Sequence, residues 1–268
     1  MNGLVGIILL DTKRFWINRL RILTSLIQPL LYLFVLGAGL SASSPIVGDG
    51  YQRYIFPGIV AFSLLFTANS AAISIVFDRQ LGFLKAVLVA PISRPAIAFG
   101  KIVSGALQAL VTGLLLVLCS PFVGMNFTLP MFGKFLAAMV LSALVFSALG
   151  VGFASRLTAI TSFPIFSNTI LLPMFFLSGA IYPLDNAPMW LRAFARLDPV
   201  TYSVDLMRGS LFGRYVFSIP LSLTVLTGFL PAPPCAAASS TPPWRYSDSC
   251  RYSSGRAHNP RAGLRRHD

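Results

Sequence analysis

Long apolar stretches that follow one another along the chain constrain its fold more than any other feature. They extend over about residues 22–40, 54–77, 102–123, 131–155 and 163–182. A helix needs about 20 mostly apolar residues to cross a hydrocarbon core of about 30 Å, and a helix satisfies its backbone polar groups without water. The pattern therefore predicts an all-α integral membrane protein.

A sixth apolar stretch begins near Tyr215 and is truncated at Pro231. At 1.5 Å per residue this helix would reach only about 24 Å, which is short of the hydrocarbon thickness. From Pro231 the composition changes to Pro, Ala, Ser and Arg without periodicity, which predicts a disordered tail. Two origins of the tail stay open, a frameshift in a GC-rich gene and a natural basic tail that attracts anionic lipid.

The predicted organisation has three parts. Residues 1–21 form an N-terminal amphipathic interfacial helix, although a charged lead-in to the first span explains the same pattern. Residues 22–230 form a transmembrane domain of six transmembrane helices, the sixth truncated, and residues 231–268 form the basic tail. Residues 183–214 are amphipathic rather than uniformly apolar, and they predict two short helices at a membrane interface.

The distribution of charge predicts how the chain is oriented. Hydrophobic residues make up 55% of the chain and charged residues 11%, so the net charge of +13 is typical of membrane loops rather than of nucleic-acid binding. Nine basic residues fall in the segments expected on one side, and two fall on the other. This asymmetry favours a multi-pass protein of the plasma (inner) membrane with a cytoplasmic N-terminus. The nine are Lys13, Arg14, Arg19, Arg21, Arg79, Lys85, Arg94, Lys101 and Arg156; the two are Arg53 and Lys134.

The sequence predicts no catalytic residue, no metal site and no cofactor bound by this chain. The three cysteines have no metal-ligand spacing, both histidines fall in the tail, and Asp185, Asp198 and Asp205 form the only acidic cluster, which helix capping explains in part. Lys101 is followed by Ile102, and Pro95 stands where a phosphate-binding loop requires glycine. The chain is therefore not expected to be an enzyme.

Two segments, 78–101 and 177–211, carry more specific information. Together they resemble the type 2 ATP-binding-cassette (ABC) permease family, especially its daunorubicin-resistance-like drug and lipid exporters, over about residues 10–225. The resemblance implies that the first segment contains a cytoplasmic coupling helix, which sits in a groove of a separate ATPase subunit. It implies that the second segment forms short re-entrant helices on the outer side.

The resemblance carries over to individual positions. The ATPase-coupling residues that it implies are Gly82, Phe83, Leu84, Lys85, Pro91, Ser93 and Arg94. The outer signature that it implies is Gly179, Tyr182, Pro183, Pro188, Trp190, Pro199, Tyr202, Asp205 and Arg208. The family usually has glutamates in the coupling segment, whereas this chain has Gln80 and Ala86 at the expected positions and no glutamate anywhere.

The function that the resemblance implies is that of a permease subunit in an ATP-driven exporter of hydrophobic drugs, antibiotics or lipid-like molecules. ATP and Mg would be bound by the partner ATPase, and the permease would pair with a second copy or a related permease in the lipid membrane. Asn69, Gln108 and Asn168 are candidate pathway residues, although interhelical hydrogen bonding is the more common role of such amides. A secondary carrier, a membrane-embedded lipid or glycan transferase and an inactive truncated permease are the alternatives.

Overall fold

The computed structural model describes residues 2–37, 39, 51–80, 94–125, 127–157, 161–184, 187–213 and 215–230. Every regular element in these ranges is a helix, which agrees with the predicted all-α fold. Four helical segments are long and apolar enough to cross a membrane, namely Arg19–Leu36, Tyr51–Asp78, Ala96–Leu118 and Leu129–Arg156. The shorter apolar helices Ser162–Leu177 and Ile219–Phe229 lie where the fifth and sixth spans are predicted. The predicted tail, 231–268, lies outside the described residues.

The N-terminal region forms two helices that meet at Asn18. Helix α1 (Asn2–Ile17) ends there because the Asn18 side chain accepts a hydrogen bond from the backbone N–H of Arg21 and caps α2 (Arg19–Leu31). Helix α2 continues into one π-helical turn, η1 (Tyr32–Leu36). The first candidate span thus begins at Arg19, before the predicted Ile22. Helix α1 packs on α6, where buried Asp11 contacts Lys101 and Ser104.

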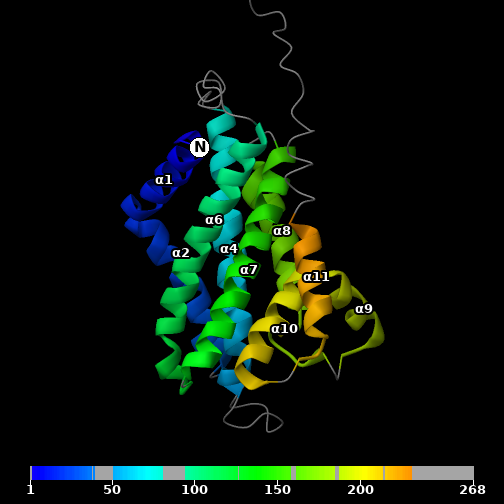
Figure 1. Ribbon diagram of the computed structural model, residues 1–268. Coiled ribbons are helices and arrows are strands. Elements are labelled where there is room, and N and C mark those ends of the chain that lie inside the picture. Colours follow the sequence, from blue (N-terminus) through cyan, green and yellow to red (C-terminus); the bar gives the residue numbers. More distant parts are fainter. Residues whose placement is uncertain are drawn as a thin grey trace, which may run out of the picture.

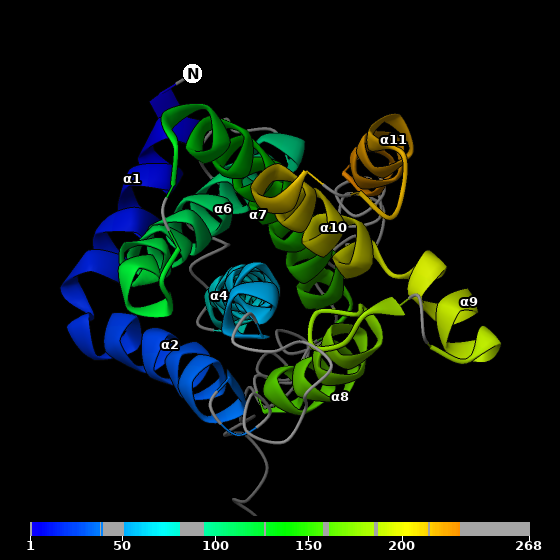
Figure 2. The same cartoon turned by 90° about the horizontal axis from the view of Figure 1, so that it is seen from below.

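Helix α4 (Tyr51–Gln80) forms the centre of the bundle. In the end-on view the other helices surround it, and its closest neighbours are α6 (Arg94–Leu118) and α7 (Leu129–Arg156) (Figure 2). Helices α6 and α7 form a hairpin, joined through the short helix η3 (Ser120–Val123). Small residues allow close packing here, since a Cβ on Gly150 would lie 3.2 Å from Asn69 Cα.

The remaining helices lie on the side of α4 away from α1, and the first of them is the neighbour of α2 in the end-on view (Figures 1 and 2). They are α8 (Ser162–Leu177), α9 (Met189–Leu197), α10 (Pro199–Phe212) and α11 (Ile219–Phe229). Helix α8 ends at Leu177, before the predicted Tyr182, because the chain turns at Gly179 with φ +71°.

The two short helices predicted after α8 are α9 and α10, and they differ in burial. Helix α9 exposes most of its side chains, as an interface helix does, but α10 is buried along almost its whole length against α4 and α7. The burial of α10 is not expected from the sequence, because this helix carries the charged side chains of Asp205 and Arg208. The structure satisfies these two charges within the protein instead.

The bundle has two ends. We call the end at which α4 stops and α6 starts the upper end, since it lies at the top of Figure 1, and the end that holds Tyr51 and Gly124 the lower end. The segment 81–93, which holds most of the implied coupling residues, lies outside the described residues, and so does Asp185.

Candidate coupling site

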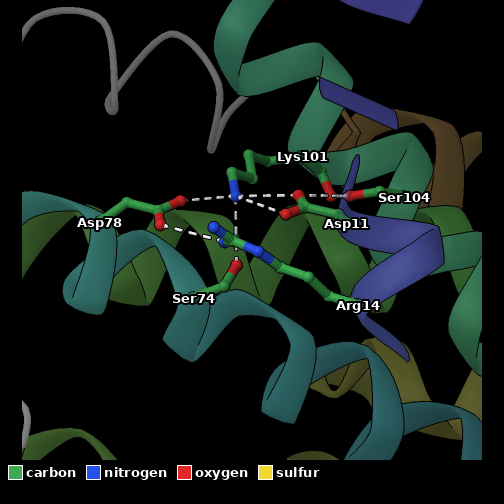
Figure 3. A network of polar contacts seen from close by, with 6 residues as sticks. All are labelled: Asp11, Arg14, Ser74, Asp78, Lys101 and Ser104. Carbon is green, nitrogen blue, oxygen red and sulfur yellow. Dashed lines mark hydrogen bonds and ion pairs between the residues drawn. The ribbon is translucent and has the colours of Figure 1, made fainter. Parts of the chain in front are cut away.

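A cluster of charged side chains joins three helices at the upper end of the bundle (Figure 3). Lys101 of α6 lies at its centre, with its Nζ 2.8 Å from Asp11 Oδ2 of α1 and 2.8 Å from Asp78 Oδ2 of α4. The same Nζ donates a hydrogen bond to Ser74 Oγ over 3.3 Å. One ammonium group thus bonds to two helices other than its own.

Two further side chains complete this Lys101 cluster. Ser104 Oγ donates to Asp11 Oδ2 over 3.2 Å, and Arg14 Nη1 lies 3.5 Å from Asp78 Oδ1. The side chains of Asp11, Asp78 and Lys101 are only 5%, 10% and 11% exposed, whereas that of Arg14 is 52% exposed. Two carboxylates and two cations make the cluster neutral. The ion pairs of Lys101 are the strongest in the cluster, because solvent and salt screen interactions between buried charges least.

The cluster follows from short spacings on each helix. Asp11 and Arg14 are three apart on α1, Ser74 and Asp78 four apart on α4, and Lys101 and Ser104 three apart on α6. Residues at these spacings lie on the same face of a helix. Sequence reasoning placed Asp78 and Lys101 only as ends of a loop and overlooked Asp11, so its statement that Asp185, Asp198 and Asp205 form the only acidic cluster is wrong. Polar pairs at helical spacing inside apolar helices are the signal that could have revealed it.

The position of the cluster relates it to the predicted coupling segment. Helix α4 ends at Gln80, two residues after Asp78, and α6 begins at Arg94, two helical turns before Lys101. The chain between these two helix ends contains the residues from Gly82 to Ser93 that the resemblance implies. The Lys101 cluster therefore connects the helix that enters this segment with the helix that leaves it, and connects both to α1.

A second polar arrangement, at the lower end, contains Gly179, Asp205 and Arg208 of the predicted outer signature. Arg208 Nη2 donates to the backbone oxygens of Gly179 and Ala180, each over 3.2 Å, and its guanidinium carbon lies 3.9 Å from the centre of the Tyr54 ring. Asp205 accepts hydrogen bonds from the backbone N–H groups of Val216 and Phe217, over 2.8 and 3.0 Å. These contacts hold the turn after α8 and the entry to α11 against α10.

The other signature residues shape the turns around α10. Tyr182 donates to the backbone oxygen of Phe176, and Tyr202 donates to that of Arg196, over 2.8 and 2.7 Å. Pro188 precedes α9 and Pro199 opens α10, where a missing N–H costs nothing. Pro183 is half-buried in the turn, while Trp190 is 62% exposed on α9 and separate from the rest.

Burial of Asp198 creates a pH-dependent element beside this arrangement. Burial raises the pKa of Asp198 to about 7, although the hydrogen bond from the Val200 N–H favours the charged form. The folded chain thus binds this proton more tightly than the unfolded chain does. The contribution of this proton to the free energy of unfolding is fully present below about pH 4, and it is lost as the pH rises through about 7.

We therefore expect the melting temperature of the solubilised protein to fall between pH 5 and pH 8, by an amount equivalent to about 1–4 kcal/mol. Asp198→Asn keeps the N-cap acceptor without the charge and should flatten this profile. Thermal unfolding of both proteins across this pH range measures the effect. An identical slope in the two proteins would contradict the assignment to Asp198.

The three candidate pathway amides lie on three different helices, α4, α6 and α8. Asn69 is buried and its Nδ2 donates to Ser167 Oγ of α8, which is an interhelical contact. Gln108 is buried in α6, one turn from Thr112, whose hydroxyl lies 3.2 Å from that of Thr67. Asn168 points to the exposed side of α8. Asn69 and Asn168 therefore lie near one another, through neighbouring positions of α8.

Comparison with known proteins gives a consistent result. The sequence profile of the family described as ABC-2 type transporter matches residues 7–212. Nodulation protein J of Rhizobium leguminosarum bv. viciae is 27% identical over 215 residues, which cover 79% of this chain and 83% of that protein. The transport permease ycf38 of Porphyra purpurea is 28% identical over 210 residues, which cover 76% of this chain and 69% of that protein. The transport permease ycf38 of Cyanophora paradoxa is 28% identical over 240 residues, which cover 80% of this chain and 81% of that protein.

Proposed function

Because this chain belongs to the ABC-2 type transporter family, we propose that it is the transmembrane permease subunit of an ATP-driven exporter whose ATPase is a separate polypeptide. The observation that carries the proposal is the family match over residues 7–212, which includes both helices that border the segment 81–93. Permeases of this family work with an ABC ATPase subunit, which supplies the nucleotide chemistry that this chain is not expected to perform.

The proposed coupling route runs through the Lys101 cluster. The ATPase contacts the segment that contains Gly82, Phe83, Leu84, Lys85, Pro91 and Ser93 and ends at Arg94. A movement of this segment is transmitted to α4 and α6 together, because Lys101 bonds to Asp78, and to α1, because Lys101 also bonds to Asp11. Packed helices shift as units rather than deform continuously, so the three helices respond as one body.

The proposed topology places the upper end in the cytoplasm. The predicted charge asymmetry supports this placement, because the two basic residues predicted outside, Arg53 and Lys134, lie near the starts of α4 and α7 at the lower end. Helices α8 and α11 then serve as the fifth and sixth spans, with α9 and α10 near the outer face of the plasma membrane. The proposed assembly contains two permease chains and two ATPase subunits, with ATP and Mg on the ATPases.

The proposed substrates are hydrophobic or lipid-like molecules. The long helices of the bundle expose mainly apolar side chains, which offer little to a small ionic solute. A secondary carrier is less well supported, since the buried carboxylates of Asp11 and Asp78 both contact Lys101, which favours a fixed joint over a titrating relay. The charge cluster likewise offers no free acid or base for a transferase.

Affinity purification from native membranes tests the proposal. We expect an ATPase subunit to be recovered with the tagged chain, and to be lost when Leu84→Asp places a charge in the coupling segment. The matched substitution Leu197→Asp, at an exposed leucine of α9 near the other end, should leave the ATPase bound. Mass spectrometry and an ATPase assay of the eluate report both results. A well-folded chain that recovers no ATPase would overturn the proposal.

A further inference from the structure

Helix α9 projects sideways from the bundle. In both views it stands apart from the long helices, and it packs on α8 and α10 (Figures 1 and 2). Figure 1 shows it in the lower half of the molecule, beside α10. In a chain that spans a membrane, a helix that leaves the bundle in this way is surrounded by lipid unless another protein covers it. Its exposed side chains therefore indicate what it binds.

Two faces of α9 are apolar, and they differ in burial. Residues four apart lie on the same face of a helix. Leu191 and Ala195 form the face that packs on the protein, since Leu191 is partly buried and Ala195 is 1% exposed. Trp190 and Phe194 form the next face, and they are 62% and 55% exposed. Two large aromatic side chains thus lie uncovered on the outside of α9.

The third face of α9 carries two unpaired positive charges. Arg192 and Arg196 are both exposed, and within the described part of the chain no carboxylate forms an ion pair with either. The Nε of Arg192 donates to the backbone oxygen of Ala187 over 2.9 Å. This bond orients the guanidinium and leaves its two terminal nitrogens as donors for a ligand. Two guanidinium groups one helical turn apart suit a phosphate group, whose charged oxygens accept hydrogen bonds.

The order of the three faces fits a helix that lies in a membrane interface. Successive residues are about 100° apart around a helix, so the aromatic pair and the arginine pair flank the protein-facing pair and lie nearly opposite one another. With one side on the bundle, α9 can therefore direct its aromatic rings toward the acyl chains and its guanidinium groups toward the headgroups. Unpaired cations at this level favour lipids whose headgroups are anionic.

We propose that α9 binds anionic phospholipids through Arg192 and Arg196. The lipid phosphate accepts hydrogen bonds from the two guanidinium groups, while Trp190 and Phe194 lie among the acyl chains. The proposal goes beyond the permease function and depends neither on the ATPase nor on the transported molecule. Asp198 ends α9 and caps α10, which packs on α4 and α7. A lipid held by α9 therefore stabilises the lower half of the bundle from the side.

Fluorescence quenching in vesicles tests the proposal. The full chain carries Trp16→Phe and Trp244→Phe, so that Trp190 is its only tryptophan. It is reconstituted into mixtures of phosphatidylcholine and phosphatidylglycerol, one of which has bromine on its acyl chains to quench a tryptophan that it touches. At equal mole fraction, brominated phosphatidylglycerol should quench Trp190 more strongly than brominated phosphatidylcholine. Equal quenching by the two lipids, or quenching by neither, would overturn the proposal.

The double variant Arg192→Gln with Arg196→Gln shows whether the arginines cause the preference. It should weaken phosphatidylglycerol binding about 10- to 30-fold and bring the two lipids to equal quenching. Lys134→Gln, which removes an exposed cation near the start of α7 at the same end of the bundle, should keep the preference of the parent chain. A preference that persists in the double variant, or that is lost in the Lys134 variant, would contradict the assignment to α9.

Thermal unfolding provides a measurement that does not depend on fluorescence. In detergent without phospholipid, the double variant should melt at the temperature of the parent chain, because both arginine side chains are exposed. Added phosphatidylglycerol should raise the melting temperature of the parent chain more than that of the double variant, because a ligand stabilises the folded state that binds it. An equal rise in the two would refute the proposal. Neither measurement involves the ATPase, so such a result leaves the proposed permease function standing.

Discussion

Replacing Lys101 by methionine should destabilise the chain by about 3–5 kcal/mol, because it leaves two buried carboxylates without their common cation. Asp11 and Asp78 both approach Lys101 Nζ to 2.8 Å, and their side chains are at most 10% exposed. Methionine retains most of the volume of lysine, so the expected loss of stability comes from the missing charge rather than from poorer packing. Thermal unfolding in detergent measures it, and transport into vesicles should fall together with the stability.

Two companion variants separate the cluster from a general effect of substitution. Arg14→Met removes the other cation of the cluster but should cost less than about 1 kcal/mol, because that side chain is half exposed and its ion pair is screened. The double variant Lys101→Met with Asp78→Asn removes one of the two orphaned charges and should recover part of the loss. If the single Lys101 variant were as stable as the parent chain, Lys101 would not be the joint between these helices.

The all-α membrane fold could be predicted because apolar length alone specifies it. Each apolar run has to form a helix in hydrocarbon, and a Pro such as Pro57 does not prevent this in α4. The Lys101 cluster could not be predicted in the same way. Asp11 and Asp78 meet only because α1 and α4 both pack on α6, and a sequence pattern does not give the pairing of helices.

The burial of α10 could not be predicted either, because hydropathy counts Asp205 and Arg208 as surface residues. Their hydrogen-bond partners are backbone groups, and the sequence does not show which backbone groups a side chain will meet. Asp205 accepts from two N–H groups before α11, and Arg208 donates to two carbonyl oxygens after α8. Burial raises the pKa of Asp205, whereas these N–H groups and the nearby Arg208 lower it. Polar side chains of this kind allow a charged helix to pack in a core.

Replacing Arg208 by methionine should therefore cost about 3–5 kcal/mol of unfolding free energy and loosen the lower end of the bundle. The change removes charge-assisted hydrogen bonds to the carbonyls of Gly179 and Ala180, each worth about 1.5–3 kcal/mol, together with the stacking on Tyr54. Hydrogen exchange should increase in the turn after α8, because those carbonyl groups hold it in place.

Arg208→Lys separates geometry from charge at this position. Lysine keeps the positive charge, but its single nitrogen cannot lie flat on the Tyr54 ring while it bonds to two carbonyls, so it should recover less than half of the lost stability. Arg196→Met, on the exposed surface of α9, is the matched control and should change stability by less than about 0.5 kcal/mol. If Arg208→Lys matched the parent chain in both stability and exchange, charge alone would matter at this position. Arg208 would then stabilise the lower end through its positive charge rather than through its planar shape.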